Sequence, residues 1–269
     1  MIIEYKIKFD EVDDPVKTEE LIYHQLKNID LKIPYVALPI AYTINKFGLI
    51  ETQKIINEIE IKYPFKKLFV CQHILVNKLN FKNNIVFTPH TEKNDNFFFI
   101  PHFNPNYYEK PNIKKIEERK YKMSFLGDFN THKTREMLKK INSEEILVEE
   151  TGNWFFYKPK EEQIIFKQLY TEILNDSKIS LCPRGTGPST IRLFESMSVG
   201  SIPMIFNNLK LPSEIENSIF KINIYDLLLG KFNLPNNKEL QNMSDFLLEY
   251  YWDYLSNENL YKTIINQIQ

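Results

Sequence analysis

Short apolar runs recur along the chain and alternate with segments whose apolar residues follow helical spacing. In the first part of the chain, this pattern predicts strands at 4–9, 35–39, 67–71, 84–88 and 96–100, and helices at 16–28 and 50–62. Strands that alternate with helices and are apolar almost throughout are typical of a parallel sheet covered on both faces.

A proline-rich segment, 101–112, interrupts this pattern with three prolines in twelve residues. Proline fixes φ and lacks an amide donor, so the segment is interpreted as a linker. The prediction is therefore a first domain over 1–110 and a second over 111–269.

The alternation restarts after the linker. It predicts strands at 122–127, 145–150, 178–183 and 202–206, and helices at 132–142, 159–175 and 189–199. The tail, 243–269, has an amphipathic helical pattern, and it is left open whether it packs back on the first domain. We therefore expect an α/β protein with two Rossmann-like domains and C-terminal helices.

Composition narrows the class of protein. The apolar fraction of 43% and the charged fraction of 26% are those of an ordinary soluble globular protein. A formal net charge of -1 argues against a nucleic-acid partner. Cys71 and Cys182 lack metal-ligand spacing and indicate buried free thiols in a reducing compartment. With neither a signal-peptide pattern nor a long apolar run, the expected location is cytoplasmic, and peripheral membrane contact is left open.

One stretch, SLCPRGTGPSTIRLFESMSVGSIPMIF (180–206), concentrates glycines in a chain that has only seven. It reads as strand, loop, helix and strand, with Ser189 as the helix N-cap and Gly200 just past the helix end. Ligands of open parallel sheets bind beyond the carboxyl ends of the strands. Gly185 would let the backbone approach a phosphate, and Arg184 and Arg192 would supply donors to its oxygens.

Glu195 follows Arg192 by one helical turn and could accept hydrogen bonds from the two hydroxyls of a ribose. The set therefore indicates a nucleotide site, although neither a P-loop nor a G-x-G-x-x-G fingerprint is present. An Arg–Glu pair at this spacing is, on its own, more often a surface salt bridge.

At this point the stretch resembles the signature of exostosin-type glycosyltransferases, glycosyltransferase family 47. The matching positions are Ser177, Lys178, Leu181 to Gly185, Ser189, Arg192, Glu195, Ser196, Gly200, Ile202 and Pro203. A second resemblance lies in YKMSFLGDFNTHKTREML (121–138). Ser180 and Ser201 stand where the family often has cysteine, which suits a cytosolic form.

The resemblance implies a GT-B fold, in which two Rossmann-like domains face each other across a cleft. It also implies an inverting, metal-independent transfer from a nucleotide-sugar, with a UDP-sugar favoured, to a glycan acceptor. Glu195 would bind the ribose, while Arg184, Gly185, Ser189 and Arg192 would hold the diphosphate. Arg135, which follows Gly127, would reach the same phosphates. No metal and no other cofactor are expected, and the acidic residues at 10–14 are interpreted as a solvated turn.

The attacking hydroxyl needs a general base, and three histidines follow predicted strand ends in the first domain: His73, His90 and His102. His90 and His73 are the preferred candidates. Asp128, Glu149 and Glu150 are further possibilities. Trp154, Tyr107 and Tyr108 are candidates for stacking on sugar rings, although packing is the more common role of such residues.

Two other functions remain open at this stage. One is a fucosyltransferase-like GT-B enzyme that uses a guanine nucleotide, because such sites also place arginine and glutamate on a similar helix. The other is a catalytically silent module that binds a nucleotide or a glycan.

Overall fold

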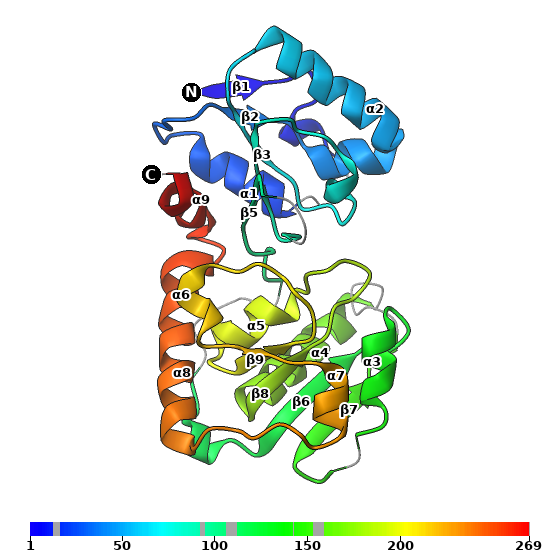
Figure 1. The fold of residues 1–269 in the computed structure, drawn as a ribbon, viewed down its shortest axis with the longest axis vertical. Coiled ribbons are helices and arrows are strands. Elements are labelled where there is room, and N and C mark those ends of the chain that lie inside the picture. The colour runs from blue at the N-terminus through cyan, green and yellow to red at the C-terminus, as the bar shows by residue number, and fades with distance from the viewer. Residues whose placement is uncertain (13–16, 92–94, 106–111, 142, 153–158, 269) are drawn as a thin grey trace. The chain divides into compact units, whose positions relative to one another are not determined.

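The computed structural model describes residues 1–12, 17–91, 95–105, 112–141, 143–152 and 159–268. The chain divides into two compact units, of which the first comprises 1–103 and 254–269 and the second 104–253. The predicted boundary at 110/111 falls among residues outside the described ranges. Both units are built on parallel sheets, which confirms the α/β class with two Rossmann-like domains (Figure 1).

The sheet of the first unit has five parallel strands in the order β1-β2-β3-β4-β5. The strands are β1 (Ile2–Glu4), β2 (Tyr35–Ala37), β3 (Leu68–Val70), β4 (Ile85–Thr88) and β5 (Phe97–Phe99). Successive side chains point to opposite faces, so the strands fill two cores. Tyr35 and Ala37 pack toward α1 (Lys17–Leu26) and α9 (Leu260–Ile268), whereas Val36 packs toward α2 (Ile40–Lys62).

Two predicted elements of this unit differ from the structure. The strand expected at 4–9 is wrong, because β1 ends at Glu4 and Phe9–Glu11 forms a 3-10 turn with Phe9 in the core. The helix expected at 50–62 begins ten residues earlier, at Ile40, and is interrupted at Gly48, whose φ is 81°. Both cysteines are buried and free, as expected.

The chain returns to the first unit through α9, which follows α8 (Asn237–Tyr250) and one π-helical turn, Tyr251–Leu255. Leu260 and Ile264 are fully buried against α1 and the sheet. Gln25 on α1 donates to the carbonyl of Asn257 and accepts from the amide of Tyr261. The C-terminal segment is therefore an integral part of the first unit's core.

The sheet of the second unit is also parallel, in the order β10-β9-β8-β6-β7. Its strands are β6 (Tyr121–Gly127), β7 (Ile146–Glu150), β8 (Ser177–Cys182), β9 (Ile202–Ile205) and β10 (Phe220–Lys221). The helices of this unit are α3 (Lys133–Leu138), α4 (Lys160–Asn175), α5 (Arg192–Ser198), α6 (Ser213–Glu216), α7 (Ile224–Leu228) and α8. The predicted strands and α4 agree with these bounds to within two residues.

The strand order of the second unit reverses between β6 and β8. The chain passes from β6 outward to β7, returns through α4 to β8 on the other side of β6, and continues outward to β9 and β10. Such a reversal separates the loops that follow the two central strands and leaves a crevice at their carboxyl ends. The loops after Gly127 and after Cys182 therefore emerge at the position where open α/β sheets bind ligands.

Candidate functional site

Two loops form the candidate site, 128–132 after β6 and 183–191 after β8. The second loop is held at its far end by Asn207, whose side-chain amide donates to the carbonyl of Pro188 at 2.5 Å. The two loops meet at Arg135 on α3, whose Nε donates to the carbonyl of Arg184 at 3.1 Å and whose Nη1 donates to the carbonyl of Asp128 at 3.3 Å. Arg135 therefore joins the two predicted halves of the site.

Arg192 lies at the centre of this site and is only 7% exposed. Its Nη2 donates to the carbonyl of Leu126, and its guanidinium lies 4.4 Å from the ring centroid of Phe125 and 5.3 Å from that of Tyr170. Nε and Nη1 of Arg192 are buried and have no partner. A buried cation with unused donors is costly unless a ligand pairs with it.

Arg135 adds a second positive charge close to Arg192. Burial, together with the charge of Arg192, lowers the pKa of Arg135 to about 10. Arg135 stays charged at neutral pH, and the charge of Arg192 is the second cause of the lowered pKa, after burial. Such an arrangement favours an anion, which would relieve the repulsion between the two guanidiniums.

Glu195 lies one turn beyond Arg192 on α5 and is 6% exposed. The hydroxyl of Tyr170, on α4, donates to its Oε2 at 2.8 Å, and this hydrogen bond is buried. Burial, opposed by the charge of Arg192, raises the pKa of Tyr170 well above its ordinary value, so this hydroxyl keeps its proton. Glu195 is thus held in one orientation by a neutral donor.

Gly127 and Gly185 are needed for space rather than for an unusual backbone, because neither has a positive φ. A Cβ on Gly127 would stand 3.0 Å from Nη2 of Arg192, and one on Gly185 would stand 3.1 Å from Nη2 of Arg135. Each glycine therefore makes room for one guanidinium. The prediction that Gly185 admits a phosphate stays a prediction.

The helix that follows the loop is shorter than predicted. Its first residue is Arg192 and its N-cap is Ile191, so the assignment of Ser189 as N-cap is wrong. The carbonyl of Thr190 takes the first helical hydrogen bond, from the amide of Leu193, while the hydroxyl of Ser189 is buried without a partner. Ser189 is thus left in the loop as a second unused donor, close in sequence to Arg192.

The end of this helix agrees with the prediction. Gly200 has a φ of 66°. Its amide donates to the carbonyl of Met197, and the amide of Ser201 donates to the carbonyl of Ser196. This pair of hydrogen bonds is the Schellman motif, which requires a left-handed residue at the position of Gly200.

The candidate bases lie in the first unit, after β3 and β4. His90 is 1% exposed, and its Nε2 lies 3.1 Å from the carbonyl of Gln72, the residue before His73. His73 is half-buried, accepts at Nδ1 from the amide of Leu75, and places Nε2 3.0 Å from Oδ1 of Asn45. The two histidines therefore share one polar region at the carboxyl ends of the strands. His102 stacks edge-on against His90, with ring centroids 5.2 Å apart.

Two residues of the site were missed by the sequence analysis. Tyr170 reaches Glu195 from a different helix, a contact that no local spacing reveals. His132 caps α3 by accepting at Nδ1 from the amide of Thr134, and burial together with the charges of Arg184 and Arg135 lowers its pKa. Tyr107, Tyr108 and Trp154 lie outside the described residues.

Within the described ranges, no group of three or more His, Cys, Asp or Glu side chains is arranged to hold a metal ion. Among the helices of those ranges, none combines the length and apolar character that crossing a bilayer requires.

Residues 103–236 match the family model of the RXYLT1 C-terminal domain, an exostosin-like xylosyltransferase domain. The match covers both loops of the site together with Arg135, Tyr170, Arg192 and Glu195. No curated protein matches this chain.

Several solved structures share a distant likeness. A crystal structure of TarM aligns with 93% of this chain and 58% of its own, at 15% identity and a TM-score of 0.41. An S. aureus TarM mutant in complex with fondaparinux, alpha-GlcNAc-glycerol and UDP aligns over the same shares at 16% identity and a TM-score of 0.41. A crystal structure of the GtfA/B complex aligns with 93% of this chain and 59% of its own, at 12% identity and a TM-score of 0.43. This chain thus spans less than three-fifths of the length of those chains.

Proposed function

We propose that this chain, whose residues 103–236 belong to the exostosin-like family of the RXYLT1 C-terminal domain, is a nucleotide-sugar glycosyltransferase. It transfers a sugar from a nucleoside diphosphate donor, a UDP-sugar in the first instance, to a hydroxyl of a glycan or glycoconjugate. The observation that carries the proposal is Arg192, a buried guanidinium with two nitrogens that have no partner, at the topological switch point of the second unit.

The diphosphate is assigned to the two loops. Nε and Nη1 of Arg192 and the hydroxyl of Ser189 are buried unused donors, and phosphate oxygens are the acceptors that suit a guanidinium best. Arg184, on the same loop as Ser189, and Arg135, on α3, add positive charge. Arg135 is already oriented by the carbonyls of Asp128 and Arg184. Gly127 and Gly185 leave the space that Arg192 and Arg135 occupy.

The ribose is assigned to Glu195. A carboxylate can accept from two neighbouring hydroxyls at once, and the hydrogen bond from Tyr170 fixes its orientation before the nucleotide arrives. Tyr170 is a positioning residue in this scheme, because it acts through Glu195.

Transfer requires stabilisation of the departing diphosphate, on which negative charge develops as the bond from the anomeric carbon breaks. Preorganised arginines can supply that stabilisation without a metal ion, and they gain strength because the site is buried. The proposed reaction is therefore metal-independent, and its rate should be unchanged by a chelator such as EDTA. The acceptor oxygen attacks from the face opposite the leaving group, which inverts the anomeric configuration.

The general base is assigned to the histidines of the first unit, with His73 ahead of His90 because His73 is half-buried whereas His90 is 1% exposed. Nδ1 of His73 accepts from the amide of Leu75, so the neutral ring carries its proton on Nε2, which faces Oδ1 of Asn45. The base would therefore be Nδ1, after it exchanges the amide of Leu75 for the acceptor hydroxyl. Hydrogen bonds of this kind often rearrange when the substrate binds. His73→Asn should lower kcat by at least about 100-fold and leave the Kd for UDP unchanged.

Thermal unfolding against a nucleotide panel tests the donor site directly. A ligand at 100 times its Kd stabilises the native state by about 2.7 kcal/mol. UDP should raise the Tm more than GDP does, and AMP should leave it unchanged. UDP-xylose is the first donor to assay, because the matching family is described as a xylosyltransferase. If neither UDP nor GDP raises the Tm, the donor-site assignment is wrong.

The same panel separates the two alternative functions. Stabilisation by GDP alone would favour the fucosyltransferase-like enzyme. Stabilisation by UDP with neither donor hydrolysis nor transfer to any acceptor would favour the silent binding module. The unused donors of the buried Arg192 support ligand binding in either case, because they are costly to maintain without a ligand, so donor hydrolysis or transfer decides between the active enzyme and the silent module.

A further inference from the structure

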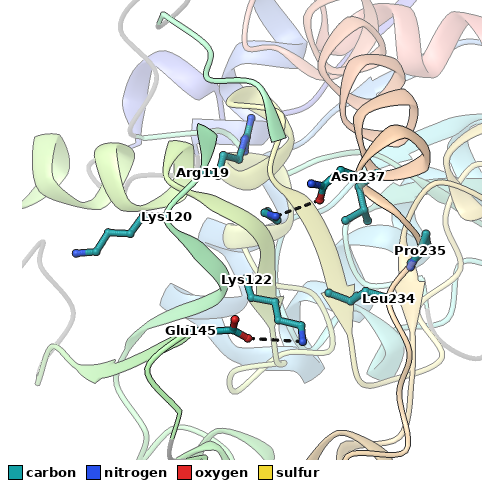
Figure 2. Close-up of a pocket in the computed structure, with 9 residues that line it drawn as sticks. Arg119, Lys120, Lys122, Glu145, Leu234, Pro235 and Asn237 are labelled. Carbon is teal, nitrogen blue, oxygen red and sulfur yellow. Dashed lines mark hydrogen bonds and ion pairs between the residues drawn. The ribbon is translucent and has the colours of Figure 1, made fainter. Parts of the chain in front are cut away.

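A cavity of about 300 Å³ lies in the second unit at the amino ends of β6 and β8 (Figure 2). It is at the opposite end of these strands from Gly127 and Cys182, and so does not belong to the proposed donor site. Four cationic residues line it, Arg119, Lys120, Lys122 and Lys178, together with one acidic residue, Glu145. The other lining residues are uncharged: Leu234, Pro235, Asn237 and Leu240.

Two of the lysines stand side by side on neighbouring strands. The register pairs Tyr121 with Ser177 and Met123 with Ile179, which places Lys122 directly beside Lys178 on the same face of the sheet. Like charges in directly opposed positions of a sheet destabilise it. The fold therefore tolerates a repulsion here that a neutral residue at either position would remove.

The neighbours of the lysine pair neutralise it only weakly. Glu145 approaches Nζ of Lys122 at 3.8 Å, but its side chain is 73% exposed, so this ion pair is worth little. Nζ of Lys178 donates to Oδ1 of Asn237, a neutral acceptor, at 3.1 Å. Figure 2 shows Lys122 directed toward Glu145, while Lys120 points away from both.

A third charge is fixed at the edge of the cavity. Arg119 is 4% exposed and donates to the carbonyls of Lys114, Ser177 and Val199, so it cannot move to meet a ligand. Its charge nevertheless adds to the field of the lysine pair, and burial lowers its pKa only to about 10. The cavity thus carries a net positive charge in a chain whose formal net charge is -1.

The opposite wall is apolar, because Leu234, Pro235 and Leu240 line it at the start of α8. A cavity of about 300 Å³ lies at the lower end of the range for small-molecule sites. We propose that this cavity binds a phosphomonoester carried on a small organic body, as in a sugar phosphate. The phosphate lies between Lys122 and Lys178, and the body packs against the apolar wall.

Calorimetric titration of the full chain with glucose 1-phosphate tests the proposal. Binding should be at least tenfold weaker in Lys122→Gln/Lys178→Gln and unchanged in Lys32→Gln/Lys66→Gln, which removes two exposed lysines of the first unit. Glu145→Gln, which removes the competing carboxylate, should bind several-fold more tightly, and it keeps the test decisive if the double lysine variant fails to fold. Glucose itself, which lacks the phosphate group, should not bind.

Two further experiments distinguish this cavity from the proposed donor site and a soluble ligand from a lipid. Arg192→Met should retain glucose 1-phosphate binding, and Lys122→Gln/Lys178→Gln should retain the rise in Tm with UDP, so failure of the donor site and failure of this one are distinguishable. Vesicles containing phosphatidic acid present the same phosphomonoester on a lipid, and binding to them but not to glucose 1-phosphate would place the ligand in a membrane. The proposal is overturned if neither probe binds, if binding survives in the double lysine variant, or if Arg192→Met abolishes it.

Discussion

Two buried arginines of the second unit provide a matched test of which one serves a ligand. Arg119 is 4% exposed and donates from all three nitrogens to backbone carbonyls, whereas Arg192 is 7% exposed and leaves Nε and Nη1 without partners. We expect Arg119→Met to destabilise the fold and Arg192→Met to weaken nucleotide binding strongly, each with little effect on the other property.

The magnitudes follow from the hydrogen bonds. Arg119→Met strands the buried carbonyls of Ser177 and Val199, at about 1–3 kcal/mol each, and also releases that of Lys114, so the free energy of unfolding should fall by roughly 3–5 kcal/mol. Arg192→Met loses one bond to Leu126, worth about 1.5–3 kcal/mol, and its stacking on Phe125. It also removes two unpaired buried donors that cost about 1–3 kcal/mol each, so the change should stay within about 1 kcal/mol.

Urea unfolding of both variants, with and without UDP, checks this expectation. Loss of a charge-assisted bond to phosphate corresponds to a roughly 10- to 100-fold weaker Kd at about 1.4 kcal/mol per tenfold. At a UDP concentration of about 100 times the Kd of the unaltered protein, the stabilisation of Arg192→Met by UDP should therefore be about 0.4–1.4 kcal/mol instead of about 2.7 kcal/mol. Arg119→Met should keep the full increment from UDP once it is folded. The reasoning would be refuted if Arg192→Met lost more than about 3 kcal/mol without nucleotide while UDP still stabilised it normally.

Three further predictions follow from the same contacts. Tyr170→Phe removes the donor to Glu195 and should weaken UDP binding about tenfold while leaving pyrophosphate binding unchanged, because pyrophosphate has no ribose; equal losses by calorimetry would contradict this. Gly185→Ala places a Cβ 3.1 Å from Nη2 of Arg135 and should weaken the binding of both UDP and pyrophosphate, which calorimetric titrations with the two compounds would measure. Burial raises the pKa of Glu19 from 4.5 to about 8, so between these values the folded protein holds a proton that the unfolded chain releases. Stability should therefore fall as pH rises through this window, and Glu19→Gln should flatten that slope in urea titrations at pH 5, 6.5 and 8; an unchanged slope would exclude Glu19 as its source.

In the second unit, β6 to β9 and α4 lie within two residues of expectation. Buried, mostly apolar runs mark β6, β8 and β9, whereas β7 is a short apolar run, Ile146 to Val148, that is only partly buried and ends in two glutamates. The first unit is predicted less well where the pattern is ambiguous. Alternating residues at 4–9 resemble a strand, but Phe9 reaches the core from a 3-10 turn instead. Apolar residues from Ile40 onward give no helical start signal, because α2 begins after Pro39 without a side-chain cap.

The site shows a similar limit. Arg192 and Glu195 are predictable as a pair, because their spacing places them on one face of a helix. Their burial and the hydrogen bond from Tyr170 are not predictable, because these depend on how α4 packs against α5. Ser189 illustrates a local signal that misleads: serine before a helical pattern is a common N-cap, yet the chain keeps one more turn of loop and starts the helix at Arg192.

The glycines of the two loops show why residue type alone cannot assign a role. A glycine beside an arginine near a strand end predicts a backbone that approaches a phosphate, and Gly185 fits this pattern. In the structure, neither Gly127 nor Gly185 has a positive φ, and the atom nearest to an added Cβ belongs to Arg192 at Gly127 and to Arg135 at Gly185. The absence of a side chain at these two glycines thus positions the arginines instead of the phosphate, because it lets two guanidiniums lie against the backbone with their positions fixed. An anion would then meet charges that are already oriented, and preorganisation of this kind, rather than loop flexibility, is what stabilises a leaving diphosphate.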